Sequence, residues 1–299
     1  MKKAYNAEII SVGTEILLGH TTNTDARDIS LMLSEIGIDV KYHTVVGDNP
    51  QRLADCIKIA RSRADIIIST GGLGPTCDDL TKQILASSFG LELKMNEHEK
   101  ECLYDYLTNK GYSKEMTGNN LKQAMLPEGC TVFHNNWGTA PGCAFKGTDG
   151  TIVLMLPGPP KECNAMFRAC AMPYLRSLSD EQIVSHAIHV FGMSESAMDQ
   201  IFRDEMNAMT NPTMAPYAKE GDCLLQVTAK AESVEKAEEM MKPVIEHACS
   251  VLGDIVFGID VDTVEESVMQ LLKEKKMTFA AAESCTGGEL AKRFTDMSG

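Results

Sequence analysis

Two adjacent aspartates, Asp78 and Asp79, follow a glycine-rich segment and are the residues of this chain best suited to carry chemistry. Carboxylates are the oxygen ligands that hard divalent cations prefer in proteins. Three glycines precede them in residues 71–74, and such a segment can turn sharply and present consecutive N–H groups to a phosphate. The carboxylates would repel that phosphate unless a cation lay between them. The spacing therefore predicts a metal-bridged phosphate site.

A plainer interpretation of this segment remains open, in which the glycines only allow a tight strand-to-helix turn. Asp78 or Asp79 would then merely cap the helix expected to begin near Leu80. Two acids and two threonines in one short loop favour the binding site, to which the helix N-terminus would add partial positive charge. In that interpretation Asp78 and Asp79 are metal ligands and catalytic residues. The substrate-binding residues are Thr70, Gly71, Gly72, Gly74, Thr76 and Thr81.

An apolar, β-branched run of three isoleucines at residues 66–68 must position this loop. Such a run is typical of a strand at the centre of a parallel sheet that helices cover on both faces. Before it, the pattern predicts strands at 7–12 and 40–46, a helix at 22–35 and a second helix that starts at 47–50. Successive strand–helix steps with short loops predict an α/β fold with a doubly wound, mostly parallel sheet.

Gly13, Thr14 and Glu15 form the sharp turn that leaves the first predicted strand. Turns at the carboxyl ends of strands are where open α/β sheets bind ligands. Glu15 is either an ordinary solvated carboxylate or a metal ligand or base beside the glycine-rich loop. We favour the site role, because both turns would lie at the same sheet edge. Thr22 or Asn23 is expected to cap the next helix.

Three segments resemble motifs of the CinA family (competence/damage-inducible protein A), whose N-terminal domain looks like molybdopterin-binding domains. They are the loop 70–81, with Asp79-Leu80-Thr81 matching the family's Asp-x-Thr, the stretch 12–19 followed by Thr22-Asn23, and the string 156–162. A further loop, 136–142, is similar to a family segment near the ligand, although a simple turn fits it equally well. The resemblance adds a catalytic Glu15 and the substrate-binding residues Gly13, Thr14, Asn23, Pro157, Gly158, Pro159 and Lys161.

Two further units are expected after a first domain at 1–173. For 174–259 the pattern predicts strands at 183–191, 223–230 and 254–257 and helices at 194–209 and 233–252, a small α+β domain that resembles the family's KH-like domain. Because no Gly-x-x-Gly loop joins its helices, we expect a spacer or dimer element rather than an RNA-binding module.

Residues 260–299 form the third expected unit, a fragment of another α/β domain with a helix at 264–275, a strand at 277–281 and a helix after Gly288. The string from Ala282 to Gly288 resembles the opening motif of the family's C-terminal nicotinamide-nucleotide deamidase domain. The serine, tyrosine and lysine that the family associates with deamidation lie beyond this motif. We therefore expect an incomplete deamidase domain without that activity.

Composition limits the classes of function. The 299 residues carry a formal net charge of −14, which disfavours broad nucleic-acid binding. No signal peptide or membrane-spanning run is present, so we expect a cytoplasmic protein with no membrane partner. The 10 cysteines form no Cys-x-x-Cys pair, which is typical of reduced thiols.

The resemblance implies metal-dependent hydrolysis of the pyrophosphate of ADP-ribose or a similar small nucleotide by a homodimer. The implied cofactor is a divalent ion, Mg²⁺, Mn²⁺ or Co²⁺, with potassium as an optional further cation. One alternative is a molybdopterin-binding or molybdenum-cofactor-related protein without hydrolase activity. Another, from the family's name alone, is a non-catalytic scaffold in DNA uptake.

Overall fold

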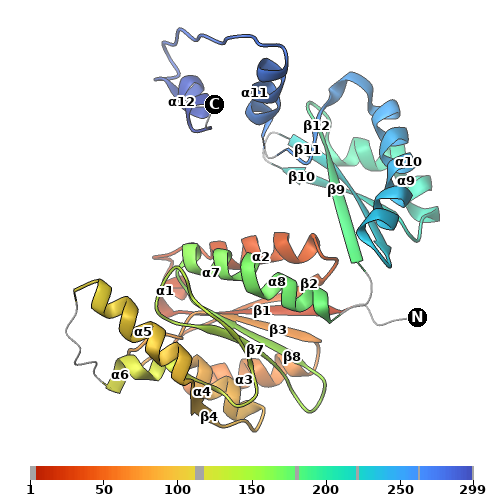
Figure 1. Cartoon of the computed structure of the whole chain (residues 1–299). Coiled ribbons are helices and arrows are strands. Elements are labelled where there is room, and N and C mark those ends of the chain that lie inside the picture. The colour runs from red at the N-terminus through yellow and green to blue at the C-terminus, as the bar shows by residue number, and fades with distance from the viewer. Residues whose placement is uncertain (1–4, 112–117, 179–181, 220–221, 262, 298–299) are drawn as a thin grey trace. The chain divides into compact units, whose positions relative to one another are not determined.

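The computed structural model describes residues 5–111, 118–178, 182–219, 222–261 and 263–297 (Figure 1). The chain divides into two compact units, Met1–Ser179 and Asp180–Gly299. Each unit is described by itself below.

A six-stranded, mostly parallel sheet forms the centre of the first unit. Its strand order is β2-β1-β3-β8-β7-β6, in which β2, β1, β3 and β8 are parallel and β7 and β6 are antiparallel. The strands are β1 (Asn6–Val12), β2 (Asp39–Val46), β3 (Ile66–Thr70), β6 (Thr131–Phe133), β7 (Gly142–Lys146) and β8 (Ile152–Leu156). The predicted doubly wound α/β fold is confirmed.

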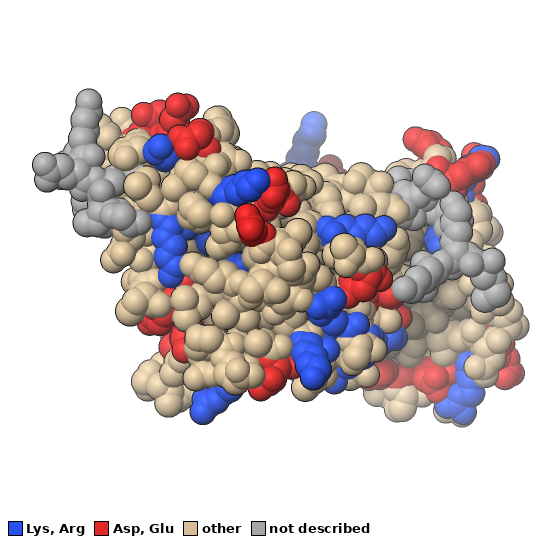
Figure 2. Space-filling model, turned by 90° about the horizontal axis from the view of Figure 1, so that it is seen from below, with Lys and Arg blue, Asp and Glu red and all other residues tan. Residues whose placement is uncertain are grey.

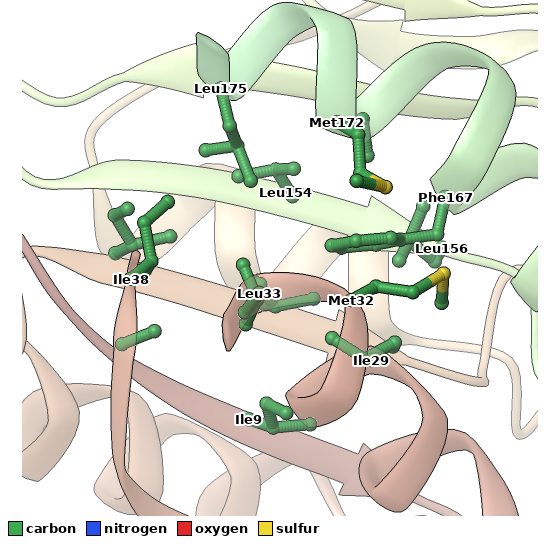
Figure 3. Packing of buried hydrophobic residues seen from close by; sticks show 14 of the residues in the cluster. Ile9, Ile29, Met32, Leu33, Ile38, Leu154, Leu156, Phe167, Met172 and Leu175 are labelled. Atoms are coloured by element: carbon green, nitrogen blue, oxygen red, sulfur yellow. The ribbon is translucent and has the colours of Figure 1, made fainter. Parts of the chain in front are cut away.

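Helices cover both faces of this sheet (Figure 1). One face carries α2 (Thr24–Ser34), α7 (Pro160–Met166) and α8 (Met172–Ser177), and the other carries α3 (Pro50–Arg61) and α4 (Thr81–Ser88). Side chains alternate along β3, so that Ile66 and Ile68 join the core under α2 while Ile67 joins the core under α3. Figure 3 shows the first of these cores, where Phe167 and Leu33 meet residues of the sheet.

Helix starts follow the expected capping chemistry. The Asn23 side chain accepts a hydrogen bond from the backbone N–H of Ala26 at the start of α2, and Asn49 does the same for Arg52 in α3. Helix α7 continues through a π-helical turn, Phe167–Ala171, into α8. Pro173 lies directly after this π-helical turn, at the start of α8.

A long crossover joins the neighbouring parallel strands β3 and β8. It contains α4, β4 (Leu93–Met95), α5 (Glu97–Asn109), α6 (Gly118–Leu121), a 3₁₀ turn at Lys122–Ala124, β5 (Met125–Pro127), β6 and β7. Strands β4 and β5 pair with each other as a separate antiparallel ribbon. Asn96 caps α5, because its side chain accepts a hydrogen bond from the backbone N–H of Glu99. A short helix, α1 (Thr14–Leu17), follows β1.

The second unit is a four-stranded antiparallel sheet covered by two helices, with strand order β10-β11-β9-β12. Its elements are β9 (Gln182–Val190), α9 (Glu195–Ala208), β10 (Thr213–Lys219), β11 (Asp222–Ala231), α10 (Val234–Leu252), a 3₁₀ turn at Gly253–Ile255 and β12 (Val256–Ile259). The predicted α+β class is confirmed, but the sequence pattern missed β10.

Two helices, α11 (Val264–Glu274) and α12 (Glu289–Thr295), follow β12. The helix predicted at 264–275 is confirmed. The strand predicted at 277–281 is wrong: these residues have no strand partner in the structure, and a strand forms only where a neighbour completes its ladder.

The surface charges show no broad basic stripe on the face drawn in Figure 2, where Lys and Arg lie among Asp and Glu. Among the residues that the structure describes, none of the helices combines the length and the apolar character needed to span a bilayer.

Candidate functional site

A cavity of about 550 Å³ opens at the carboxyl edge of the parallel strands. Its wall comes from the turns after β1, β3 and β8, from the start of α2 and from the crossover. The predicted site residues that line it are Gly13, Glu15, Asn23, Thr70, Gly71, Gly72, Gly74, Thr76, Asp78, Asp79, Pro157, Gly158 and Pro159. Its volume lies within the usual range for small-molecule pockets. The structure thus brings together three motifs that are far apart in sequence.

Gly71 and Gly72, at the start of the loop, lie where a side chain would clash with neighbouring atoms. Both have positive φ, +88° and +68°. A Cβ on Gly71 would overlap the carbonyl oxygen of Val12, and one on Gly72 would overlap the hydroxyl of Thr81. The plain steric interpretation is therefore correct for these two glycines, and it coexists with their place in the cavity wall.

The carboxylates of Asp78 and Asp79 both approach the hydroxyl of Thr76 within hydrogen-bond distance. Asp79 Oδ2 also accepts the backbone N–H of Thr76 at 2.8 Å. The Thr76 hydroxyl, the backbone N–H of Asp78 and the positive charge of Lys122 hold the pKa of Asp78 below its usual value. Neither aspartate caps α4, whose N-cap position is Leu80 without a side-chain hydrogen bond. The capping interpretation was wrong, because both carboxylates accept hydrogen bonds from Thr76 within the loop instead.

This arrangement fits a hard divalent cation only in part. Two carboxylates and a hydroxyl around one point provide the oxygen ligands that Mg²⁺ takes, which usually include one or two carboxylates besides phosphate oxygens and water. Within the described ranges no group of three or more His, Cys, Asp or Glu side chains is arranged to hold a metal ion by itself. A cation at Asp78 and Asp79 would therefore need ligand oxygens to complete its shell.

Three backbone donors of the loop, all in residues that line the cavity, are not used within the loop. Gly71 N–H donates to the carbonyl of Leu156, which ties the loop to the neighbouring strand. In the part of the chain that the structure describes, the N–H groups of Gly72, Leu73 and Gly74 have no acceptor. Three adjacent N–H groups in a glycine-rich turn form an anion-binding concavity.

Acidic side chains dominate the charged lining of the cavity. The lining contains the carboxylates of Glu15, Asp25, Asp48, Asp78, Asp79 and Glu162, and no Lys or Arg among the described residues. An anionic ligand next to these carboxylates requires a cation to offset the repulsion. The charge pattern thus favours a ligand that enters together with metal.

Three predicted site residues do not line the cavity. The Thr14 hydroxyl donates to Asp48 at 2.7 Å and holds two turns together. Thr81 is buried, and its hydroxyl packs beneath Gly72 without a hydrogen-bond partner among the described residues. Lys161 is exposed on the first turn of α7 and is not part of the lining. The direct binding roles of Thr14, Thr81 and Lys161 are therefore not supported by their positions.

Sequence reasoning did not single out Asp25, Asp48 and Gln123 as lining residues. Thr139 and Glu162 lie in the segments 136–142 and 156–162, which resembled family motifs near the ligand, but neither residue was named individually. Asp48 and Glu162 stood directly beside predicted turns, and that proximity could have identified them. Gln123 and Thr139 come from the crossover, whose path the sequence pattern did not predict. The Thr139 hydroxyl donates to Gln123 Oε1 at 2.7 Å.

Asp25, in the first turn of α2, is 7% exposed, and its Oδ1 atom has no hydrogen-bond partner among the described residues. Burial, together with the nearby negative charge of Asp28, raises the pKa of Asp25 to about 6. This carboxyl group therefore titrates close to neutral pH, unlike an exposed aspartate.

Comparison with known proteins shows to which family the chain belongs. The model of a "Probable molybdopterin binding domain" matches residues 8–177, that of the "Damage-inducible protein CinA KH domain" matches 185–258, and that of the "CinA C-terminal domain" matches 261–299. A "CinA-like protein" of Dictyoglomus turgidum is 45% identical over 292 residues, which cover 98% of this chain and 70% of the relative. The chain belongs to the CinA family.

Other relatives agree with this assignment. A "Putative competence-damage inducible protein" of Clostridium beijerinckii is 46% identical over 285 residues, which cover 95% of this chain and 69% of the relative. The crystal structure of "the protein CinA with unknown function" from Thermoplasma acidophilum is 35% identical and has a TM-score of 0.52. It covers 57% of this chain and 98% of its own. The predicted family and the KH-like second unit are confirmed.

The third part of the chain is matched as a CinA C-terminal domain over residues 261–299. The resemblance of its opening motif to that domain is thereby confirmed. This match does not support the expectation that the domain is incomplete.

Proposed function

We propose that the first unit hydrolyses the pyrophosphate bond of ADP-ribose or a similar nucleotide with the help of a divalent cation. The observation that carries this proposal is the cavity lining, in which Gly72, Leu73 and Gly74, with N–H groups that have no acceptor, lie with six carboxylates and, among the described residues, no basic side chain. Backbone donors suit a phosphate, and the carboxylates suit the cation that must accompany it.

In the proposed reaction, the residues of the cavity have distinct roles. Water forms a new P–O bond as the bridging P–O bond of the pyrophosphate breaks, which yields AMP and ribose 5-phosphate. A divalent cation at Asp78 and Asp79 would neutralise phosphate charge and acidify a water molecule. The N–H groups of Gly72, Leu73 and Gly74 hold phosphate oxygens as charge shifts onto the leaving group. Glu15, whose carboxylate lies on the cavity wall, accepts the proton from water.

The test is to incubate the purified chain with ADP-ribose and Mg²⁺, Mn²⁺ or Co²⁺ and to follow AMP release. We expect Asp79→Asn to lower kcat/KM by about 100-fold or more while the fold is kept, because a metal-site partner is lost. The matched control is Asp55→Asn, an exposed aspartate on α3 that does not line the cavity. Full activity of Asp79→Asn with unchanged metal dependence would refute the assignment.

A second candidate function is molybdopterin binding without hydrolysis. The match of residues 8–177 to a "Probable molybdopterin binding domain" favours it. Both ligands present phosphate next to a fused ring, so the loop could serve either. If molybdopterin displaces ADP-ribose from the chain and no AMP is released with any of the three metals, this second function is the correct one.

A further inference from the structure

A second, smaller cavity of about 180 Å³ adjoins the main one in the first unit. Thr139 lines both cavities. Glu162 lines the main cavity and accepts a hydrogen bond at 2.7 Å from Asn135, which lines the smaller one. The two cavities therefore lie side by side and share a wall.

A buried carboxylate paired with a half-exposed imidazole forms one side of the smaller cavity. Glu99 on α5 is 5% exposed, and its two carboxylate oxygens lie 3.1 and 3.0 Å from Nδ1 of His134. A buried carboxylate requires a donor, so the proton lies on Nδ1 and is donated to Glu99. In the neutral imidazole, His134 Nε2 is then an acceptor, for which the described residues offer no partner.

The remaining lining of the smaller cavity is mainly polar. It includes the phenol of Tyr106, the amide of Asn136 and the thiol of Cys102, with Leu103 as an apolar side. Its volume is below that of a site for a whole small molecule, which suits one part of a ligand. A planar nucleobase is usually bound between apolar or aromatic faces, whereas this lining suits a compact group with several hydroxyls.

We propose that the smaller cavity binds the sugar that lies beyond the phosphates of a nucleoside diphosphate sugar. His134 Nε2 accepts a hydrogen bond from a sugar hydroxyl, and Glu99 fixes the imidazole in the orientation and tautomer that this contact needs. The phosphates remain at the loop 71–79 in the main cavity. This inference rests on the proposed function, because it places the second half of the same ligand.

The experiment measures binding with ligands that cannot be hydrolysed. Isothermal titration in Mg²⁺ compares α,β-methylene ADP-ribose with α,β-methylene ADP, which lacks the second sugar. We expect the ADP-ribose analogue to bind the full chain at least about 10-fold more tightly, equivalent to about 1.4 kcal/mol. If both analogues bind equally, or neither binds, the proposal is wrong.

Variants of His134 separate a binding role from a structural one. In His134→Asn the amide can still donate to Glu99, as Nδ1–H does, but no acceptor replaces Nε2. We expect the preference for the ADP-ribose analogue to fall to about twofold or less, with the affinity for the ADP analogue unchanged. The control is His98→Ala, which removes an exposed histidine of α5 that lines neither cavity.

Two other outcomes overturn the inference. One is an unchanged preference in His134→Asn, and the other is an equal loss of affinity for both analogues, which would indicate a merely structural pair. The proposed hydrolysis is tested separately by AMP release. A sugar preference that depends on His134, without AMP release, refutes hydrolysis alone, whereas AMP release without that preference refutes the sugar site alone.

Discussion

Gly71→Ala probes how firmly the glycine-rich loop is held. Gly71 has φ of +88° and donates its N–H to the Leu156 carbonyl at 3.1 Å. An alanine Cβ at this position would overlap the carbonyl oxygen of Val12, which belongs to the backbone of β1 and cannot rotate away. The substitution must therefore move the loop, the strand or both.

The expected magnitude has three parts. Positive φ costs an alanine about 1–2 kcal/mol. Forcing an extra methyl into packed backbone costs about 1–3 kcal/mol, and weakening the bond from Gly71 to Leu156 adds about 1 kcal/mol. We therefore expect Gly71→Ala to lower the free energy of unfolding of the first unit by about 3–6 kcal/mol.

The matched control is Gly90→Ala in the same unit. Gly90 has φ of +71°, but no atom lies within 4 Å of a Cβ placed there, so only the first part of the cost applies. Urea unfolding is followed by the fluorescence of Trp137, the single tryptophan, which lies in the first unit. Equal destabilisation by the two variants would refute the argument that the Val12 carbonyl excludes a side chain at Gly71.

Three further predictions follow from charged side chains. Lys161→Ala is expected to leave the rate of AMP release within about twofold, because Lys161 does not line the cavity; a 10-fold loss would contradict this placement. Burial lowers the pKa of Lys82 from 10.5 to about 8, so its contribution to stability should rise by about 3 kcal/mol from pH 8 to 10.5. Urea unfolding at several pH values should show that rise in the wild type relative to Lys82→Met, and parallel profiles would refute it. Burial opposes the charged form of His186, but hydrogen bonds to Asp260 and Glu238 outweigh it and raise the pKa of His186, so its stabilisation is full below pH 6.5 and is lost as pH rises through the raised pKa. Circular dichroism of urea unfolding should show this loss in the wild type but not in His186→Asn, and a loss of equal size in both would contradict it.

Local patterns predicted the elements that carry strong signals of their own. The isoleucines of β3, the asparagine caps of α2 and α3 and the apolar spacing of α10 each specify one element without information from elsewhere. β10 was missed because Pro216 interrupts its pattern. The strand tolerates this proline because β10 lies at the edge of its sheet, where one side of the backbone needs no partner.

The part of the site that is formed by the turns after the strands could be predicted from the sequence. Glu15, Asp79 and Gly158 were placed correctly because the carboxyl ends of parallel strands meet at one edge. Asp25 and Gln123 could not be found in this way, since their positions depend on how α2 and the crossover pack. The strand predicted at 277–281 failed for a related reason, because strand propensity does not supply a neighbouring strand.

The crossover between β3 and β8 has a consequence for how ligand range can change in evolution. The turns after β1, β3 and β8 that line the main cavity have a geometry that the sheet enforces, as the overlap at Gly71 illustrates. Thr139, Gln123 and His134 belong to the crossover instead, and they lie outside the four parallel strands. Substitutions there can alter the crossover side of the cavity while the sheet and its glycine-rich turn are inherited unchanged. Under the proposed function, related chains can diverge in the organic part of the ligand and still recognise the same phosphate.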